Sequence, residues 1–82
     1  MQVNEVASRL IARSGLATNS VSTALGKSRE WARQASRLDR IPRLDTIADI
    51  ADVAGCDVVL VDRATGATVG VVEPPRRAAG EH

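Results

Sequence analysis

Residues 18–35 read "TNSVSTALGKSREWARQA", and this stretch decides the fold that the sequence predicts. In its first half the apolar residues recur at the spacing of one helix face: Val21, Ala24 and Leu25. We expect this helix to begin at Thr18 or Asn19. It should end at Gly26, because glycine adopts the left-handed backbone that closes many helices.

The second half of the stretch predicts another short helix. Ser28 can accept hydrogen bonds from the first backbone N–H groups of a helix, and Ala32 and Ala35 fall on the side that would face inward. Pro42 cannot continue the helix, so we expect it to span roughly residues 29–38. Two short helices joined by a glycine-containing turn, with the second one basic, are typical of a motif that enters the DNA major groove.

Helical periodicity also flanks this pair. Upstream, one apolar face consists of Val3, Val6, Ala7, Leu10 and Ile11. Asn4 is the candidate cap of that helix and Gly15 its stop. Downstream, a continuous stripe consists of Leu44, Ile47, Ala48, Ile50, Ala51 and Ala54. Asp45 in its first turn favours the helix dipole and Gly55 should end it, so residues 1–55 are predicted to form a four-helix domain.

Beyond this domain the pattern changes from helical to extended. Two β-branched runs, Val58 to Val61 and Thr68 to Val72, are separated by a segment that contains Thr65-Gly66. Pro74-Pro75 should end the second run. We therefore expect a β-hairpin within residues 56–73, followed by a disordered tail over residues 74–82.

Charge is sorted along the chain although the net charge is only +1. Residues 27–43 hold six basic and two acidic side chains, a net of +4, whereas residues 44–62 hold five aspartates and no lysine or arginine, a net of −5. Such asymmetry favours one face that addresses a polyanion. Arg29, Arg33 and Arg37 would share one face of a helix and repel one another there, which an anionic partner such as a DNA duplex would relieve.

From Gly15 to Gly55 the sequence resembles the lambda-repressor-like helix-turn-helix domain of the Cro-like, XRE family. The landmarks fall in register without a gap: Gly15-Leu16, Leu25-Gly26, Ser28-Arg29, Arg40, Pro42-x-Leu44-x-Thr46, Ile50-Ala51 and Gly55. The resemblance implies a mainly α fold, a four-helix lambda-repressor-like helix-turn-helix domain, here followed by a C-terminal β-hairpin. The chain departs from the family pattern at Ala17, where a capping residue is usual, at Lys27, where an aliphatic residue is common, and at Leu38, where glycine is common.

The resemblance also implies roles for individual residues. The start of the recognition helix would read base edges, which gives Arg29, Glu30, Arg33 and Gln34. Arginine can bind guanine, glutamine can bind adenine and glutamate can accept from cytosine. The DNA backbone would be bound by Thr18, Asn19, Lys27, Ser28, Arg37, Arg40 and Arg43.

Several of these residues also have a purely structural interpretation. Glu30 can pair with Arg33 or Arg37, Gln34 can be a solvated helix former, and Thr18 and Asn19 can act as caps alone. Trp31, the only aromatic residue, is left open between packing beside the inward alanines and lying in the DNA groove.

The hairpin is predicted to be a dimerisation element. An apolar set at alternate positions consists of Val58, Leu60, Val69 and Val71, and Val59, Val61 and Val72 make the other face apolar as well. Because two strands alone are marginal in water and one helical domain cannot cover both faces, we expect a homodimer. The alternative is a hairpin that folds back onto the fourth helix of its own domain.

No catalytic or metal-binding pattern is present in the sequence. The only histidine is His82, the only cysteine is Cys56, and neither a Gly-rich phosphate loop nor a nucleophile elbow occurs. We therefore expect no enzyme activity, no cofactor and no metal. With no apolar run of membrane length, no signal-peptide pattern and no cysteine pair, we expect a cytoplasmic protein.

The function that these patterns predict is a sequence-specific double-stranded DNA-binding transcriptional regulator. We expect a phage or bacterial repressor, or a Cro-like switch protein, that binds a pseudo-palindromic operator as a dimer. One alternative is an antitoxin or another module that uses the same fold to bind a protein partner. A further alternative is a recombination directionality factor, in which a wing would follow the basic segment directly.

Overall fold

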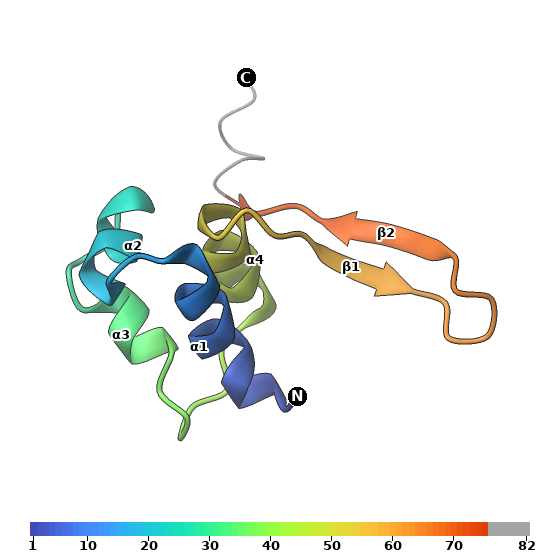
Figure 1. Ribbon diagram of the computed structural model, residues 1–82, viewed down its shortest axis with the longest axis horizontal. Coiled ribbons are helices and arrows are strands. Elements are labelled where there is room, and N and C mark those ends of the chain that lie inside the picture. Colours follow the sequence, from blue (N-terminus) through green and yellow to red (C-terminus); the bar gives the residue numbers. More distant parts are fainter. Residues whose placement is uncertain (76–82) are drawn as a thin grey trace.

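Four helices are followed by a two-stranded antiparallel hairpin in the computed structural model, which describes residues 1–75 (Figure 1). The helices are α1 (Val3–Ser14), α2 (Thr18–Ala24), α3 (Trp31–Ala35) and α4 (Leu44–Val53), and the strands are β1 (Val58–Val61) and β2 (Thr68–Val72). The predicted layout, mainly α with a C-terminal hairpin, is confirmed.

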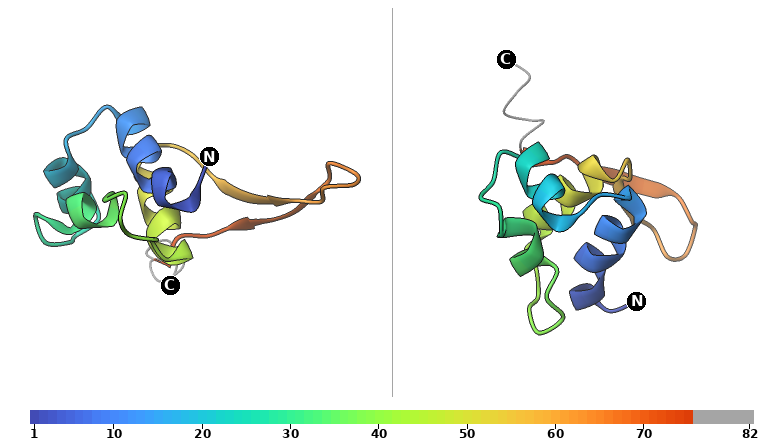
Figure 2. Two further views of the ribbon diagram at one scale, coloured as in Figure 1. Left: turned by 90° about the horizontal axis from the view of Figure 1, so that it is seen from below. Right: turned by 60° about the vertical axis from the view of Figure 1, so that its left-hand side comes forward.

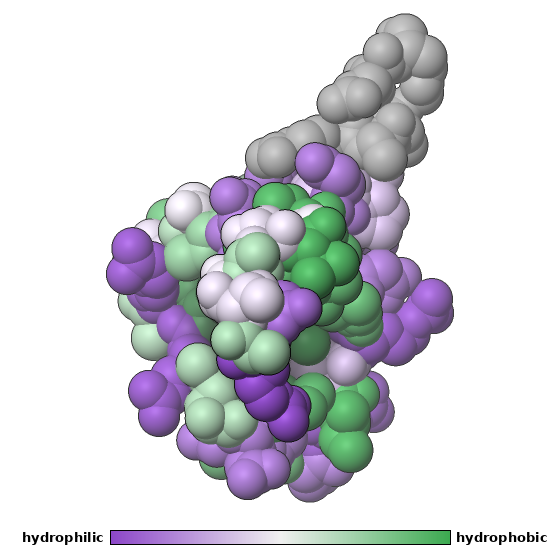
Figure 3. All heavy atoms as spheres, turned by 90° about the vertical axis from the view of Figure 1, so that its right-hand side faces the viewer, coloured by the Kyte–Doolittle hydropathy of each residue, from purple (hydrophilic) through white to green (hydrophobic). Residues whose placement is uncertain are grey.

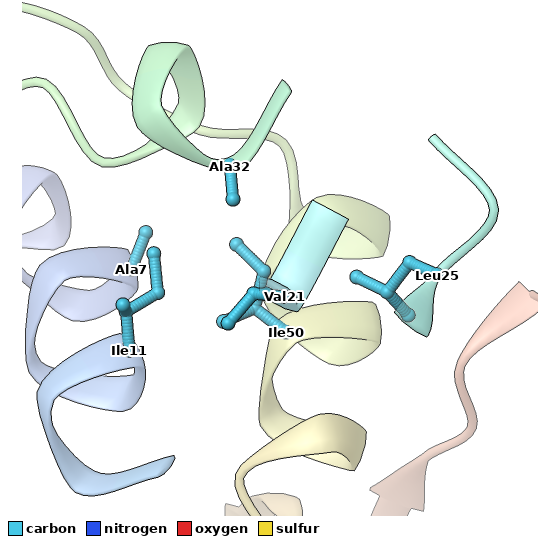
Figure 4. Close-up of a cluster of buried hydrophobic side chains, with 6 residues drawn as sticks. All are labelled: Ala7, Ile11, Val21, Leu25, Ala32 and Ile50. Atoms are coloured by element: carbon cyan, nitrogen blue, oxygen red, sulfur yellow. The ribbon is translucent and has the colours of Figure 1, made fainter. Parts of the chain in front are cut away.

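The core lies where the four helices meet. Figure 4 shows its buried side chains, which come from every helix and its borders: Ala7, Ile11, Val21, Leu25, Ala32 and Ile50. The side chain that α3 contributes is only a methyl group, and Trp31 packs against the edge of this cluster. The periodic apolar positions of the sequence therefore do face inward, and the tryptophan lies beside the small residues of α3.

Glycines end α2 and α4 as the sequence predicts. Gly26 has a φ of 68°, its N–H donates to the carbonyl of Thr23, and the N–H of Lys27 donates to the carbonyl of Ser22 at 2.9 Å. Gly55 has a φ of 71° and closes α4 in the same way: its N–H donates to the carbonyl of Asp52, and the N–H of Cys56 donates to the carbonyl of Ala51. Residues with a Cβ rarely adopt this left-handed backbone, so glycine is favoured at both turns.

The predicted caps at the helix starts are wrong. Asn4 lies inside α1, where the Glu5 carboxylate instead accepts the backbone N–H of Gln2 at 2.9 Å. Thr18 is the first residue of α2, and the cap position, Ala17, makes no side-chain hydrogen bond. The amide of the half-buried Asn4 instead donates to the carbonyl of Leu38, in the loop after α3.

The hairpin has the predicted strand bounds and extends away from the helical body (Figures 1 and 2). Its connection is held by Asp62, whose carboxylate accepts the N–H groups of Ala64 and Thr65 and whose carbonyl accepts the N–H of Gly66. Only the base of the hairpin lies beside α4. The alternative in which the hairpin folds back along α4 is therefore wrong.

The predicted grouping of the hairpin side chains into two faces is also wrong. Val58 pairs with Val72, and Leu60 pairs with Gly70, but the register shifts by one residue between Leu60 and Val61. Beyond the shift, Val61 pairs with Thr68. If the Val61–Thr68 register continued along both strands without a bulge, Val58, Leu60, Val69 and Val71 would lie on one face, as predicted. Because a one-residue shift moves side chains to the opposite face, Val58 and Leu60 share a face with Val72, and Val71 shares a face with Val59.

The predicted tail does not begin at Pro74. This proline follows β2 and is buried, so the chain is still packed against the rest of the protein there. The remaining part of the predicted tail, residues 76–82, lies outside the described residues.

Candidate nucleic-acid interface

A buried hydroxyl on α2 fixes the position of α3. Ser22 is fully buried, and its Oγ accepts the backbone N–H of Ala32 at 2.8 Å. The same hydroxyl donates to the carbonyl of Thr18 at 3.1 Å. Since the first N–H groups of a helix have no partner within the helix, Ser22 stabilises the start of α3 from a neighbouring element.

This hydrogen bond also explains why α3 begins later than the predicted helix of residues 29–38. A helix that began at Ser28 would need the N–H of Ala32 for the carbonyl of Ser28, but that N–H donates to Ser22. The carbonyl of Ser28 accepts from Trp31 instead, at 3.0 Å. Ser28 is therefore not the cap of α3, and the cap position is Glu30, which makes no side-chain capping hydrogen bond.

The predicted row of three arginines on one helix face is not formed. Arg33 lies within α3, whereas Arg29 lies in the turn before it and Arg37 lies in the loop after it. The helix ends at Ala35, and the Ser36 hydroxyl donates back to the carbonyl of Arg33 at 3.1 Å. The cations therefore surround a short helix instead of following one stripe.

The four predicted base-reading residues all lie on the exposed side of this segment. Arg33 and Gln34 point outward from α3, opposite the buried Ala32. Arg29 and Glu30 precede them in the turn and are exposed as well. Glu30 and Arg33 form an ion pair with 3.6 Å between Oε2 and Nη1, which is the structural alternative that the sequence left open.

Thr18 and Asn19 open α2, at the start of the same helix pair. Thr18 is half-buried and Asn19 is exposed. Their carbonyl groups accept the hydroxyls of Ser22 and Thr23, at 3.1 and 2.9 Å. These contacts leave the Asn19 side chain on the surface next to the turn that leads into α2.

The loop that follows α3 is held by a hydrogen bond from α1 to its backbone and by an ion pair within the loop. The Asn4 amide of α1 donates to the carbonyl of Leu38 at 2.7 Å. Arg37 forms two hydrogen bonds to Asp39, from Nε to Oδ1 at 3.1 Å and from Nη2 to Oδ2 at 2.8 Å. The loop nevertheless exposes two large apolar side chains, Leu38 at 61% and Ile41 at 79%.

The remaining cations of the basic segment divide into paired and unpaired ones. Arg43 pairs with Asp45, with 3.1 Å between Nη2 and Oδ2. Within residues 1–75, Lys27, Arg29 and Arg40 form no ion pair with an acidic side chain. Three cationic side chains near α3 thus have no carboxylate partner in this range.

A hollow of about 230 Å³ lies between α3 and the loop that follows it. Apolar and donor side chains line it together: Trp31, Gln34, Ala35, Arg40, Ile41, Pro42, Arg43 and Thr46. Trp31 is half-buried, and the Lys27 ammonium lies 5.5 Å from its ring centroid. The predicted reading residue Gln34 and the predicted backbone-binding residues Arg40 and Arg43 are brought together around this hollow.

Two residues that position this surface were missed by the sequence predictions. Ser22 interrupts the apolar face of α2, and a buried hydroxyl needs a partner, but the sequence does not indicate where that partner lies. Asn4 makes a contact with a residue distant in sequence, for which no local pattern exists.

Two further features are absent from the described residues. Among residues 1–75, no group of histidine, cysteine, aspartate and glutamate side chains could hold a metal ion. In the same range no helix has the length and apolar character needed to cross a bilayer. No family model, curated protein or solved structure matches the chain.

Proposed function

We propose that the protein is a sequence-specific, double-stranded DNA-binding transcriptional regulator with a lambda-repressor-like helix-turn-helix domain. In this proposal α3 enters the major groove, Arg33 and Gln34 contact base edges, and Arg29 and Glu30 lie at the side of the groove. The cations around the helix bind phosphates.

The observation that carries the proposal is a short helix with a methyl group inward and donor side chains outward. Ala32 is buried in the core while Arg33 and Gln34 are exposed, and Ser22 holds the helix start through its backbone. Side chains that read bases must be held on a rigid element, because a bidentate contact to a base edge has strict geometry. The arrangement meets that requirement.

The ion pairs around α3 do not oppose this function. The pairs of Arg33, Arg37 and Arg43 lie on exposed side chains, and exposed ion pairs contribute only about 0–1 kcal/mol to stability. An arginine can therefore exchange a carboxylate for a phosphate at little cost. Where a ligand does not place phosphates beside these arginines, the carboxylates of Glu30, Asp39 and Asp45 stay paired with them and disfavour binding of that ligand.

We further propose that a dimer binds a pseudo-palindromic operator. A single α3 presents few base-reading side chains, and two copies related by a two-fold axis read two half-sites about 34–36 Å apart. Phage and bacterial repressors and Cro-like switch proteins are the class of regulator that this architecture fits.

A salt titration tests the proposal. The protein is titrated with a library-selected duplex at several salt concentrations, and log Kd should rise linearly with log salt, with a slope of about 0.9 per neutralised phosphate. Arg40→Gln should reduce this slope by about 0.9, which corresponds to the loss of one phosphate contact. The control, Arg9→Gln, removes a charge from α1 and should leave the slope unchanged. A Kd that does not depend on salt concentration, or the absence of binding to any duplex, would contradict the proposal. Either result would favour a protein partner, as in an antitoxin.

A further inference from the structure

The hairpin exposes apolar side chains on both faces. Its largest exposures are those of Val59 at 41%, Leu60 at 54%, Val61 at 56%, Val69 at 71% and Val71 at 47%. Neither strand carries a charged residue. Exposed, uncharged strands that extend from the body (Figure 2) are an aggregation hazard unless something covers them, and a two-stranded hairpin is marginal by itself.

An apolar groove lies at the base of the hairpin. Its volume is about 440 Å³, and α1, the loop before α4, α4 and the start of β1 line it: Val3, Val6, Leu10, Pro42, Leu44, Ile47, Ala51, Asp57 and Val58. Asp57 is the only charged residue in this lining. Figure 3 shows the molecule from the side to which the hairpin points, and strongly hydrophobic residues gather in more than one place on that side.

A cation without an ion pair lies at the tip of the hairpin, next to the carboxylate of Asp62, and a carboxylate without an ion pair lies at its base. At the tip, the Asp62 carboxylate accepts backbone hydrogen bonds of the connection, and the exposed Arg63 has no ion pair within residues 1–75. At the base, Asp57 is exposed and likewise forms no ion pair in the part of the chain that the structure describes. A hairpin with a cation at its tip and a carboxylate at its base is complementary to an antiparallel copy of itself.

We propose that two copies of the chain associate through antiparallel hairpins, so that the tip of each hairpin lies at the apolar groove of the other copy and Arg63 pairs with Asp57 across the interface. The valine faces lie against each other between these ends. Two-fold symmetry forms the Arg63–Asp57 contact twice. The pairing specifies the dimer of the proposed function, but it does not depend on DNA.

A second copy fits these observations better than a different partner. The same chain carries the groove and the apolar hairpin that can cover it, and it carries both members of the charge pair. An isologous interface requires this self-complementarity, whereas a foreign partner would need only one of the two surfaces.

Charge reversal tests the pairing on the full chain by sedimentation equilibrium. Asp57→Arg and Arg63→Asp should each raise the dimer Kd by about tenfold or more, because each replaces two attractive contacts with two repulsive ones. The double variant Asp57→Arg/Arg63→Asp has the wild-type net charge and should restore the dimer Kd. Both substituted side chains are exposed, and circular dichroism checks that each of the three variants is folded.

The control separates this proposal from the proposed function. Arg33→Asp changes α3, far from the hairpin, and should abolish DNA binding while it leaves the dimer Kd unchanged. The single hairpin variants should still bind one half-site. A monomeric wild-type protein at high micromolar concentration, single variants that dimerise like the wild type, or a double variant that stays monomeric would each overturn the pairing, whatever the DNA result.

Discussion

The hydroxyl of Ser22 accepts the backbone N–H of Ala32 at 2.8 Å and thereby joins α2 to α3. The bond lies inside the protein, where Ser22 and Ala32 are both fully buried. A helix of five residues is too short to be stable alone, so α3 depends on such tertiary contacts. The position of the candidate surface on α3 consequently depends on this hydrogen bond.

Ser22→Ala should lower the free energy of unfolding by about 1–3 kcal/mol, because it leaves the Ala32 N–H buried without an acceptor. Urea denaturation followed by circular dichroism measures the change. Ser20→Ala, on the exposed side of α2, is the matched control and should change the stability by less than about 0.5 kcal/mol. Equal effects of the two substitutions would show that the joint contributes nothing.

Gly26→Ala should destabilise the protein by about 1–2 kcal/mol, because a side chain at a φ of 68° strains the backbone. No atom within 4 Å would meet the added Cβ, so the effect isolates the backbone term. Gly70→Ala is the control: this glycine lacks a positive φ, and nothing lies within 4 Å of a Cβ added there. Thermal unfolding should show a lowered Tm for the first variant only.

Gln34→Ala and Arg40→Ala should affect DNA binding in different ways. Gln34 projects from α3, so its loss should change the ranking of single-base operator variants by about 1–3 kcal/mol at one position. Arg40 lies in the loop, so its loss should weaken every sequence alike and reduce the salt dependence. Competition binding against a panel of base variants measures both. An unchanged ranking for Gln34→Ala would remove this residue from the reading surface.

Trp31 should report DNA binding by fluorescence. It is the only aromatic residue of the chain, it is half-buried, and it shares a hollow with Gln34 and Arg40. A bound duplex should exclude water from that hollow and alter the tryptophan emission. The change should reverse when salt dissociates the complex. Emission that stays constant while another assay shows binding would place the duplex away from α3.

Much of the fold follows from local patterns in the sequence. The strands Val58–Val61 and Thr68–Val72 and the end of α4 at Gly55 are where the β-branched runs and the glycine predict them. These signals work because strand and helix-end preferences depend on neighbouring residues. The paired faces of the hairpin could not be predicted, because a single bulge beside Val61 exchanges them.

The sequence predicted which side chains of the candidate surface are exposed better than it predicted the helix and loop that carry them. The exposed residues Arg33 and Gln34 do lie outward on α3, because the alanines beside them must face the core. The start of α3 could not be predicted, since the N–H of Ala32 donates to Ser22 on another helix. Likewise, the ion pair of Arg37 with Asp39 depends on a loop conformation that Asn4 of α1 helps to hold.

The extended hairpin also divides the molecule into two units that can open separately. Within residues 1–75 each strand is paired only with the other strand, and the core of small aliphatic side chains lies entirely among the helices. Amide hydrogen exchange should therefore show two levels of protection, one for the helical core and a lower one for the hairpin. Because association stabilises whatever it covers by mass action, the hairpin amides should exchange more slowly as protein concentration rises.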